Sequence, residues 1–506
     1  MTTPAKDPPV VKLEDDVVQQ KEGTPRLRRN KNSHQELDIL EKTSSSSSSG
    51  SAKSTTESQL VSKLDRLILP LTVLIHLAAY LDRGIFGNSR LLGLQDDILD
   101  DSKQFDLALS LFFIGHVLFM IPGNLLAKVL SPPWWIGSMS ICWAITATLQ
   151  AAAFNFAGIG TCRFFLGVFE AGFGPAIVLY FSFWYRPREL ALRNAVYISS
   201  GPLAGAFSGL ISYGISRAHD TSISRWRIMF LVEGFPSIIL GIVIFLLLPD
   251  RPHSALYLTE KERELAVARI NAPAGGGIEK IEVVRAFKDY RIIMSGISFA
   301  GFTLALASTV SFLPSILADF DFDADKVQLY TVPPYLCAFV TMLVSAYTSD
   351  KVFGERGLHI VVLSALGGIG YLLLLLTTSY QVKYLGVFLV LMGIYPCLPL
   401  TLSWVSNNIR NETRRAVGIA AVILVGNCFS IMGTQIFPSS EGPRYVRGFT
   451  ICCVFLFVSA VMALLQRVLL QREKRLIQEV EMETIPDDSS TTENSTTTTY
   501  HWVPTL

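Results

Sequence analysis

The fold of this chain is decided by the stretch Cys162-Arg163-Phe164-Phe165-Leu166-Gly167-Val168-Phe169-Glu170-Ala171-Gly172-Phe173-Gly174-Pro175. It lies in an apolar run from Ala157 to about Trp184, which is long enough to cross a bilayer. A charged side chain deep in a membrane helix costs about 2.5–3.5 kcal/mol, so it is normally paired or faces a water-filled cavity. The stretch therefore predicts a membrane-spanning helix in which Arg163 and Glu170 are candidate functional residues.

The spacing of Arg163 and Glu170 decides whether they can bind each other. Seven residues turn a helix by about 700°, roughly 20° short of two turns, so both side chains leave one face about 10 Å apart. This separation is too large for a direct ion pair and leaves each residue free to bind another group. The alternative is a structural role, in which polar groups of neighbouring helices hold both residues.

The distribution of apolar residues, rather than their amount, indicates an integral membrane protein. The chain has 506 residues, of which 50% are hydrophobic, and a formal net charge of +1. Residues 1–65 and 471–506 are almost entirely polar, so the apolar residues concentrate in the middle. The balanced charge and the lack of a basic binding module argue against a nucleic-acid partner. The 7 cysteines lie inside apolar runs without metal-ligand spacing, so we expect no metal site and no cofactor.

Apolar runs of membrane-spanning length follow one another from Leu67 onward. They cover about 67–88, 106–126, 135–154, 157–184, 195–216, 228–248, 292–318, 328–348, 358–378, 384–405, 415–437 and 449–470. An even number of spans places both tails on the same side of the membrane. Basic residues concentrate in the loops after the even-numbered spans, so the positive-inside rule places both tails in the cytosol. The sequence thus predicts an all-α integral membrane protein with 12 transmembrane helices.

The longest connection between spans runs from Pro249 to about Arg291 and divides the spans into six and six. We expect a disordered cytosolic tail at 1–65, six-helix bundles at 66–249 and 292–470, a cytosolic linker at 250–291, and a disordered cytosolic tail at 471–506. Within the linker, Thr259-Glu260-Lys261-Glu262-Arg263 has the pattern of a capped helix start. Two six-helix bundles joined in this way are typical of secondary transporters, whose site lies between the halves.

Motifs along the whole chain resemble those of one known family. In the first half they are Tyr80-Leu81-Asp82-Arg83, Gly87-Asn88, Pro122-Gly123-Asn124, Arg163 through Pro175, Phe183-Trp184-Tyr185 and Trp226-Arg227. In the second half they are Ser349-Asp350-Lys351, Arg356-Gly357, Asn407-Asn408, Thr413-Arg414-Arg415-Ala416 and Gly426-Asn427. In this order they are similar to the major facilitator superfamily and, within it, to the fungal anion:cation symporters, which include allantoate, nicotinate and pantothenate permeases. The resemblance covers Leu64 to Arg467 and implies the major facilitator fold.

The chain departs from the pattern of that group at several positions. Ile85 stands where the group usually has asparagine, and Met120 and Gly123 stand where it often has glutamate and serine. His116 replaces a common tyrosine, and Ala127-Lys128 stand in place of the acidic signature between spans 2 and 3. These departures leave the substrate and the direction of transport open.

Span 1 carries a second candidate face. His76, Tyr80 and Arg83 follow i, i+4, i+7 spacing and so line one side of the helix, with Asp82 beside them. The resemblance implies that spans 1, 4, 7 and 10 line a central cavity, which brings span 1 opposite span 4. An organic anion requires positive charge in a dry site, and arginine can bind a carboxylate with two donors. We expect the substrate to be bound by Arg83, Arg163, Tyr80 and Asn88.

Proton coupling requires a group whose affinity for a proton responds to burial and to a neighbouring cation. Glu170, Asp82 and His76 meet this requirement. For Asp82 and Arg83 the alternative is a charge pair at the outer end of the helix, and for His76 it is a hydrogen-bonded packing role. Glu233, early in span 6, is expected to be structural. The resemblance further implies a conformational latch formed by Asp350, Lys351 and Arg356.

Other function classes fit these features less well. A membrane enzyme would need a nucleophile and base or a metal cluster, an ATP-driven pump would need a nucleotide-binding motif, and a nutrient sensor would need a long structured tail. The resemblance favours proton-coupled symport that takes up a small organic anion, such as a vitamin or a nitrogenous metabolite. Efflux of an acidic metabolite is the alternative. We expect a monomer in the plasma membrane, with the bilayer, the anion and protons as its partners.

Overall fold

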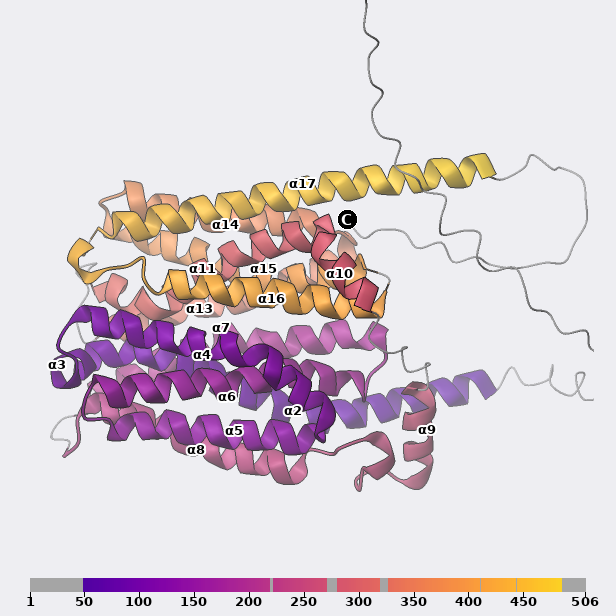
Figure 1. Ribbon diagram of the computed structural model, residues 1–506, viewed down its shortest axis with the longest axis horizontal. Helices are drawn as coiled ribbons and strands as arrows, with labels where there is room; N and C mark the ends of the chain where they lie inside the picture. The colour runs from indigo at the N-terminus through magenta and orange to yellow at the C-terminus, as the bar shows by residue number, and fades with distance from the viewer. Residues whose placement is uncertain are drawn as a thin grey trace, which may run out of the picture. The chain divides into compact units, whose positions relative to one another are not determined.

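The computed structural model describes residues 49–218, 222–270, 280–318, 326–409, 411–442 and 444–484. These residues form helices joined by turns and contain no β-strand (Figure 1). From Leu60 onward the described residues belong to one compact unit. The all-α prediction is therefore confirmed for the described part of the chain.

Long helices account for every predicted span. They are α2 (Ser49–Ser89), α4 (Ser102–Val129), α5 (Pro132–Leu149), α6 (Phe156–Ser182), α7 (Pro187–Ser216), α8 (Arg225–Leu247), α11 (Tyr290–Ala318), α13 (Val332–Tyr347), α14 (Gly357–Leu376), α15 (Tyr380–Asn407), α16 (Glu412–Gly433) and α17 (Val446–Thr484). Within the described ranges, 10 helical segments are long and apolar enough to cross a membrane. The helices α5 and α7 are the long ones outside that set.

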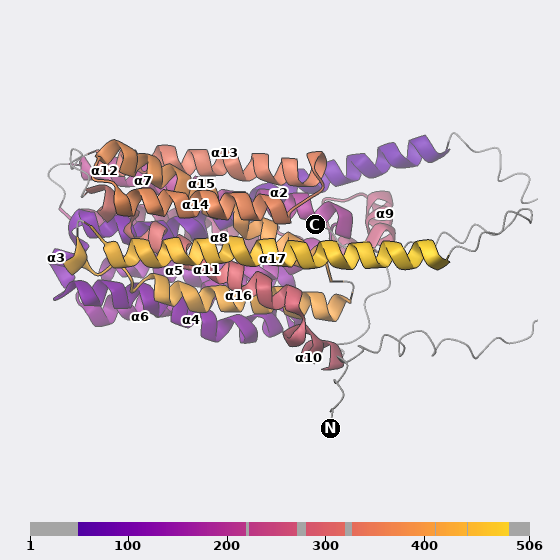
Figure 2. The same cartoon turned by 90° about the horizontal axis from the view of Figure 1, so that it is seen from above.

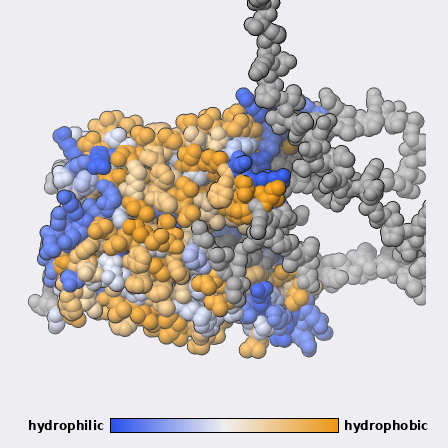
Figure 3. All heavy atoms as spheres, in the orientation of Figure 1, coloured by the Kyte–Doolittle hydropathy of each residue, from blue (hydrophilic) through white to orange (hydrophobic). Residues whose placement is uncertain are grey.

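Short helical segments connect the long ones. They are η1 (Arg90–Leu94), α3 (Gln95–Ile98), η2 (Gln150–Ala152), η3 (Pro252–Ser254), α9 (Glu260–Ile270), α10 (Lys280–Lys288), α12 (Val327–Tyr330), η4 (Thr348–Val352) and η5 (Ser439–Glu441). In both ribbon views α3 lies at one end of the long helices, and α9 and α10 lie at the other (Figures 1 and 2). Hydrophobic side chains cover the middle of the face seen in Figure 3, and hydrophilic ones gather towards its ends. This distribution is the one that a bilayer requires of a protein that spans it.

Two boundaries of the predicted disordered tails are wrong. The helix α2 begins at Ser49, and its Leu60 and Leu64 are buried, so residues 49–65 are not a disordered tail. Leu60, Leu64 and Ile68 recur every four residues, which gives a polar segment one apolar face. At the other end α17 continues to Thr484, so residues 471–484 are helical as well. The rest of both tails lies outside the described residues.

Glycines allow α4 and α6 to touch backbone to backbone. A Cβ atom at Gly115 would lie 2.3 Å from the carbonyl oxygen of Phe164, and one at Gly167 would lie 2.0 Å from that of Phe112. Any side chain at either position would collide with main-chain atoms that cannot move aside. The small residues of the stretch 162–175 therefore determine how closely α6 packs on α4.

Helices of the first half contact helices of the second half near the end that carries α3. The hydroxyl groups of Ser110 on α4 and Thr434 after α16 lie 2.7 Å apart. Gln435 donates through Nε2 to Ser110 Oγ at 2.7 Å and to the carbonyl oxygen of Asp106 at 2.8 Å. A Cβ at Gly87 of α2 would lie 2.6 Å from the carbonyl oxygen of Ser311 on α11. The two halves are therefore in direct contact at this end.

The linker contains the predicted helix and one that was not predicted. The predicted helix is α9, and its start is capped by reciprocal hydrogen bonds between Thr259 and Glu262 at 2.9 and 3.4 Å. Ion pairs attach α9 to the first half, since Lys63 contacts Glu262 at 2.7 Å and Arg269 contacts Glu189 at 2.6 Å. The additional helix is α10, which immediately precedes α11.

Candidate functional site

Charged side chains come together inside the first half of the chain, among helices that are otherwise apolar. They are Asp82 and Arg83 on α2, Arg163 and Glu170 on α6, and Glu233 on α8. All except Arg83 are classed as buried. Burying charge in a membrane protein is costly, so such a cluster is a candidate functional site.

Arg83 and Glu170 form an ion pair between α2 and α6. Arg83 Nε donates to Glu170 Oε1 at 2.8 Å, and a second nitrogen of the same guanidinium donates to the same oxygen. The Glu170 side chain is only 6% exposed, whereas that of Arg83 is 24% exposed. Arg83 therefore connects the buried Glu170 carboxylate to a part of the site that is more exposed to solvent. As the spacing predicted, Glu170 does not pair with Arg163, but its partner on α2 was not predicted.

Arg163 is buried without an ion-pair partner within the described ranges. It is 2% exposed, and its Nε and Nη1 have no hydrogen-bond acceptor there. Its guanidinium carbon lies 4.3 Å from the ring centre of Phe86 and 5.2 Å from that of Phe112. Cation–π contacts of this kind stabilise the charge, but they leave its N–H groups unsatisfied. Arg163 can therefore bind an additional acceptor.

Asp82 and Glu233 are buried carboxyl groups with unsatisfied oxygens. Asp82 Oδ2 and both carboxyl oxygens of Glu233 have no hydrogen-bond partner in the part of the chain that the structure describes. Asp82 lies close enough to Glu170, Arg163 and Glu233 to interact electrostatically with them. The structure does not contain the alternative, a charge pair of Asp82 with Arg83 at the outer end of the helix. Asp82 is buried, and Arg83 pairs with Glu170 instead.

The predicted face of α2 exists. The rings of His76 and Tyr80 lie 4.7 Å apart, and the guanidinium carbon of Arg83 lies 4.7 Å from the ring centre of Tyr80. His76 Nδ1 lies 2.5 Å from the hydroxyl of Ser200 on α7, and its ring lies 4.0 Å from that of Tyr197. His76 is therefore hydrogen-bonded and packed, which is the geometry of its structural alternative.

Asn88 lies more than one helical turn after Arg83 on α2 and is hydrogen-bonded to α7. Its Nδ2 donates to Ser208 Oγ at 2.9 Å, while its Oδ1 has no partner among the described side chains. The amide therefore keeps one acceptor for another group, although no contact joins it to the Arg83–Glu170 pair.

Comparisons with known proteins agree with this architecture. The sequence model of one protein family, the Major Facilitator Superfamily, matches residues 72–434. The chain belongs to the major facilitator superfamily. It is accordingly a transporter and not an enzyme.

Two curated fungal relatives of this major facilitator are similar over most of its length. The MFS transporter prlL of Fungal sp. (strain NRRL 50135) is 32% identical over 417 residues, which cover 79% of this chain and 84% of the relative. The major facilitator-type transporter hxnP of Emericella nidulans is 34% identical over 408 residues, which cover 78% of this chain and 82% of the relative. These relatives, which are fungal transporters, support the superfamily, but they do not distinguish the anion:cation symporter group.

Solved structures show the same fold at low sequence identity. A bacterial homolog of the human lysosomal transporter Spinster, in an inward-facing and occupied conformation, matches with a TM-score of 0.60 and 15% identity over 79% of this chain and 96% of its own. A D-xylose-proton symporter matches with a TM-score of 0.63 and 12% identity over 78% and 96%. The major facilitator fold predicted from the sequence is therefore confirmed.

The second half of this major facilitator reaches the site through tyrosines that sequence reasoning missed. A Cβ at Gly201 of α7 would lie 3.2 Å from the Tyr80 ring and 3.6 Å from the ring of Tyr395 on α15. Tyr335 on α13 lies 6.1 Å from Tyr395, ring centre to ring centre. Tyr80 and Tyr395 thus meet across a glycine at the boundary between the halves. The sequence signal that could have found Tyr395 was its position directly before Pro396 inside an apolar run.

The predicted latch residues of this major facilitator form one ion pair. Arg356 donates through Nε and Nη2 to Asp350 Oδ1 at 3.1 and 2.8 Å. The Lys351 side chain is exposed, and Arg356 is buried. Gly354 between them has a φ of +60°, a conformation that glycine adopts at little cost. The turn after α13 is thus shaped to bring Asp350 and Arg356 together.

Proposed function

We propose that this transporter moves a small organic anion, coupled to protons, by alternating access and in the direction of uptake. The observation that supports this proposal best is Arg163, a buried guanidinium with two nitrogens that no described acceptor reaches. Arg83, a second arginine, contacts the same Phe112 ring. Arginine stays charged in proteins and can bind a carboxylate through two parallel hydrogen bonds. A carboxylate is the ligand that satisfies both the charge and the geometry of Arg163.

The ion pair of Arg83 and Glu170 supplies a mechanism for proton coupling. Arg83 donates to Glu170 in the structure. In the proposed mechanism, a substrate carboxylate competes with Glu170 for the hydrogen-bond donors of this guanidinium. When Glu170 accepts a proton it loses its charge, and its attraction to Arg83 weakens. Arg83 then binds the substrate beside Arg163, with Tyr80 and Asn88 as further polar contacts. Asp82 is a second candidate for the proton, since it interacts electrostatically with Arg163 without forming an ion pair, and His76 is a third.

Charge accounting also favours coupling to a cation. An anion that enters a compartment held negative is opposed by about 2.3 kcal/mol per charge for each 100 mV. At least one proton must therefore accompany a monoanion, and accumulation driven by the membrane potential requires more. We infer proton-coupled uptake because the buried carboxyl groups offer sites for protons next to the arginines.

Alternating access needs contacts that form in one state and break in another. The contacts of Ser110, Thr434 and Gln435 hold the halves together at the α3 end. We place the six-helix bundles at 66–249 and 292–470, with the linker 250–291 and both termini in the cytosol and the protein, as a monomer, in the plasma membrane. In this orientation the α3 end faces outward and is closed. Asp350, Lys351 and Arg356 lie at the cytosolic end as the latch.

Vesicle transport assays test the proposed function directly. Counterflow is measured with a panel of radiolabelled mono- and dicarboxylates, followed by accumulation after a pH jump. We expect at least one carboxylate to exchange and to accumulate when the outside is made acidic. Accumulation only when the inside is acidic would favour efflux of an acidic metabolite. Exchange of neutral or cationic compounds alone would contradict an anion transporter.

The orientation makes a separate prediction. Because both termini and residues 250–291 are placed in the cytosol, epitope tags at either terminus or after Pro249 should be reached by antibody only after the cells are permeabilised. Tag accessibility in intact and permeabilised cells is the measurement, with a tag in the loop 319–325 as the external control. A terminal tag that is labelled in intact cells would contradict the orientation.

The latch makes a third prediction, for the variant Asp350→Asn. Asparagine keeps an acceptor oxygen for the buried Arg356 but loses the charge, which costs about 1 kcal/mol in the state that contains the ion pair because Asp350 is partly exposed. We expect exchange to slow while the protein still folds, because the balance of conformations shifts. The exposed neighbour gives the control, since Lys351→Gln should exchange normally. Normal exchange rates in Asp350→Asn would exclude a latch.

A further inference from the structure

The helix α10 (Lys280–Lys288) carries an apolar stripe that no described part of the protein covers. Ile281, Val284 and Phe287 are 62%, 57% and 63% exposed. At about 100° per residue their three positions span roughly 120° of the helix surface. Glu282 and Ala286 are buried and lie on the opposite side. The helix is therefore amphipathic, with its apolar face turned away from the protein.

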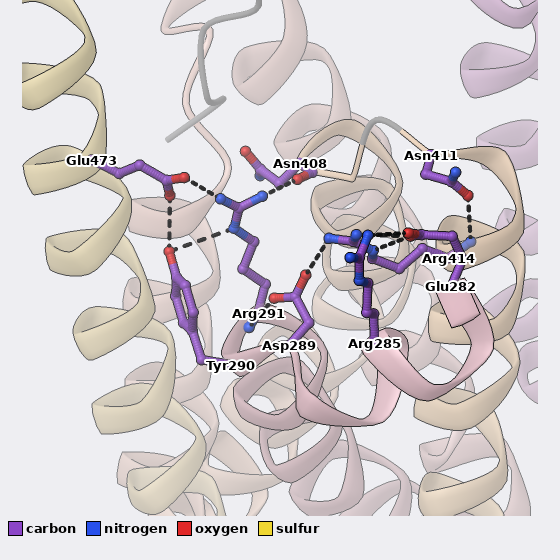
Figure 4. Close-up of polar contacts among 9 residues, drawn as sticks. All are labelled: Glu282, Arg285, Asp289, Tyr290, Arg291, Asn408, Asn411, Arg414 and Glu473. Carbon is purple, nitrogen blue, oxygen red and sulfur yellow. Dashed lines mark hydrogen bonds and ion pairs between the residues drawn. The ribbon is translucent and has the colours of Figure 1, made fainter. Parts of the chain in front are cut away.

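Charged residues hold α10 in this orientation (Figure 4). Arg414 at the start of α16 donates through Nε to Glu282 Oε2 at 2.8 Å, and its Nη2 lies 2.7 Å from the same oxygen. Arg285 Nη1 donates to the other oxygen, Oε1, at 2.8 Å. Asp289, directly after α10, lies 3.9 Å from Arg414. These contacts fasten the polar side of α10 to α16.

The next residues fasten the start of α11 to two more helices. Arg291 Nη1 donates to the carbonyl oxygen of Asn408 at the end of α15 at 2.6 Å, and its Nη2 pairs with Glu473 on α17. Tyr290 donates through its hydroxyl to Glu473 at 3.0 Å. The arrangement in Figure 4 therefore connects α10 to the starts of α11 and α16, to the end of α15 and, through Glu473, to α17.

The attachment of α10 is stable at ordinary pH. Burial raises the pKa of Glu282, but the hydrogen bonds from Arg414 and Arg285 outweigh it, so the pKa lies below its ordinary value. A carboxyl whose pKa is lowered on folding contributes stability above its unfolded pKa of about 4.3, and this is lost as the pH falls through the folded pKa. The apolar stripe thus keeps its outward orientation at neutral pH.

The surroundings of the stripe indicate what covers it. The membrane-spanning helix α11 follows α10 almost directly and has exposed apolar residues of its own near its start, namely Ile293 and Ile297. At the place of α10 in Figure 1, the space-filling view shows hydrophobic spheres beside hydrophilic ones (Figure 3). The sequence of α10 has three basic residues, Lys280, Arg285 and Lys288, against one acidic residue, Glu282, which is already paired. This combination is characteristic of helices that lie in the interface of an anionic membrane.

We propose that α10 binds the membrane interface, with its apolar stripe among the lipid acyl chains and Arg285 and Lys288 at anionic phospholipid headgroups. The membrane-spanning helix α11, which follows α10, is surrounded by lipid on its exposed side. A protein partner would have to displace this lipid to reach the apolar stripe of α10. Through Glu282 and Arg414, the position of α10 in the interface then fixes the heights of α11 and α16. This role is independent of the substrate.

Tryptophan fluorescence in vesicles tests the proposal. Phe287→Trp is reconstituted in phosphatidylcholine–phosphatidylglycerol vesicles with ordinary or brominated acyl chains, and the signal of the parent protein, which has 7 tryptophans, is subtracted. We expect the added fluorescence to be blue-shifted in ordinary lipid and largely lost in brominated lipid. Glu264→Trp on the exposed side of α9 is the matched control and should keep its fluorescence.

The headgroup contact is tested separately. In the Phe287→Trp background, Lys288→Gln should weaken the increase in blue shift that accompanies a rising fraction of phosphatidylglycerol. Equal added fluorescence in ordinary and brominated lipid would overturn the proposal, and it would do so even with a blue shift, because the stripe would then be covered by protein. Equal quenching of the Glu264→Trp control would also overturn it, since no specific contact of α10 would remain.

Discussion

Glu170→Gln is expected to abolish accumulation driven by a pH difference while leaving exchange of substrate at equal concentrations largely intact. Glutamine cannot take up or release a proton, so the switch that frees Arg83 no longer depends on pH. It is also uncharged, like the protonated glutamate, so Arg83 stays available to the substrate. Counterflow and pH-jump accumulation in the same vesicle preparation are the two measurements.

Two comparisons make this result specific. Asp82→Asn should lose both activities, because Asp82 is buried near Arg163 and its loss changes the charge around the proposed binding residue. Glu262→Gln removes an ion-paired carboxylate in the linker and should retain both. If the Glu170→Gln protein still concentrates substrate after a pH jump, Glu170 is not the coupling residue.

Arg163→Lys is expected to weaken substrate binding strongly although it preserves the charge. Lysine offers a single ammonium in place of the planar pair of donors, so at least one charged hydrogen bond of about 1.5–3 kcal/mol is lost. This corresponds to roughly 10-fold to 150-fold in apparent affinity. The contacts of the guanidinium with Phe86 and Phe112 are weakened as well. The half-saturation concentration in counterflow is the measurement.

A second arginine in an aromatic contact provides the control for Arg163→Lys. Arg227 lies 4.4 Å from the ring centre of Trp226 and donates to the carbonyl oxygen of Ala151 at 2.7 Å, so Arg227→Lys changes similar interactions outside the site. It should leave the affinity unchanged. Near-normal affinity in a normally expressed Arg163→Lys protein would show that Arg163 is structural or acts only through its charge.

Much of the fold could be predicted because the bilayer imposes strong rules on sequence. Apolar length identifies the spans, and the motif order identifies the superfamily, which the match to residues 72–434 confirms. The errors lie where helices leave the apolar region. Residues 49–65 and 471–484 have polar compositions, and a composition argument overlooks the spacing of Leu60 and Leu64. The helix α10 was missed for the same reason, since three apolar residues on one face do not make an apolar run.

The positions of several candidate residues could be predicted from spacing along a helix, but their contacts could not. Spacing along one helix places His76, Tyr80 and Arg83 on one face, and the structure has them there. The pairing of Arg83 with Glu170 depends on how α2 and α6 are rotated and shifted against each other, which spacing within either helix does not determine. The same limit hid Tyr395, whose approach to Tyr80 depends on how the two halves of the chain pack.

The close contact of α4 with α6 has a consequence for reading genetic variation in this transporter. Gly115 and Gly167 each face a carbonyl oxygen of the other helix at a distance that excludes even a methyl group. A saturation scan scored by growth will therefore rank both glycines with Arg163, although neither is chemically able to bind an anion. Protein abundance should separate the two classes, because we expect glycine variants to be depleted from the membrane and a variant of Arg163, on its proposed role, to be present and inactive.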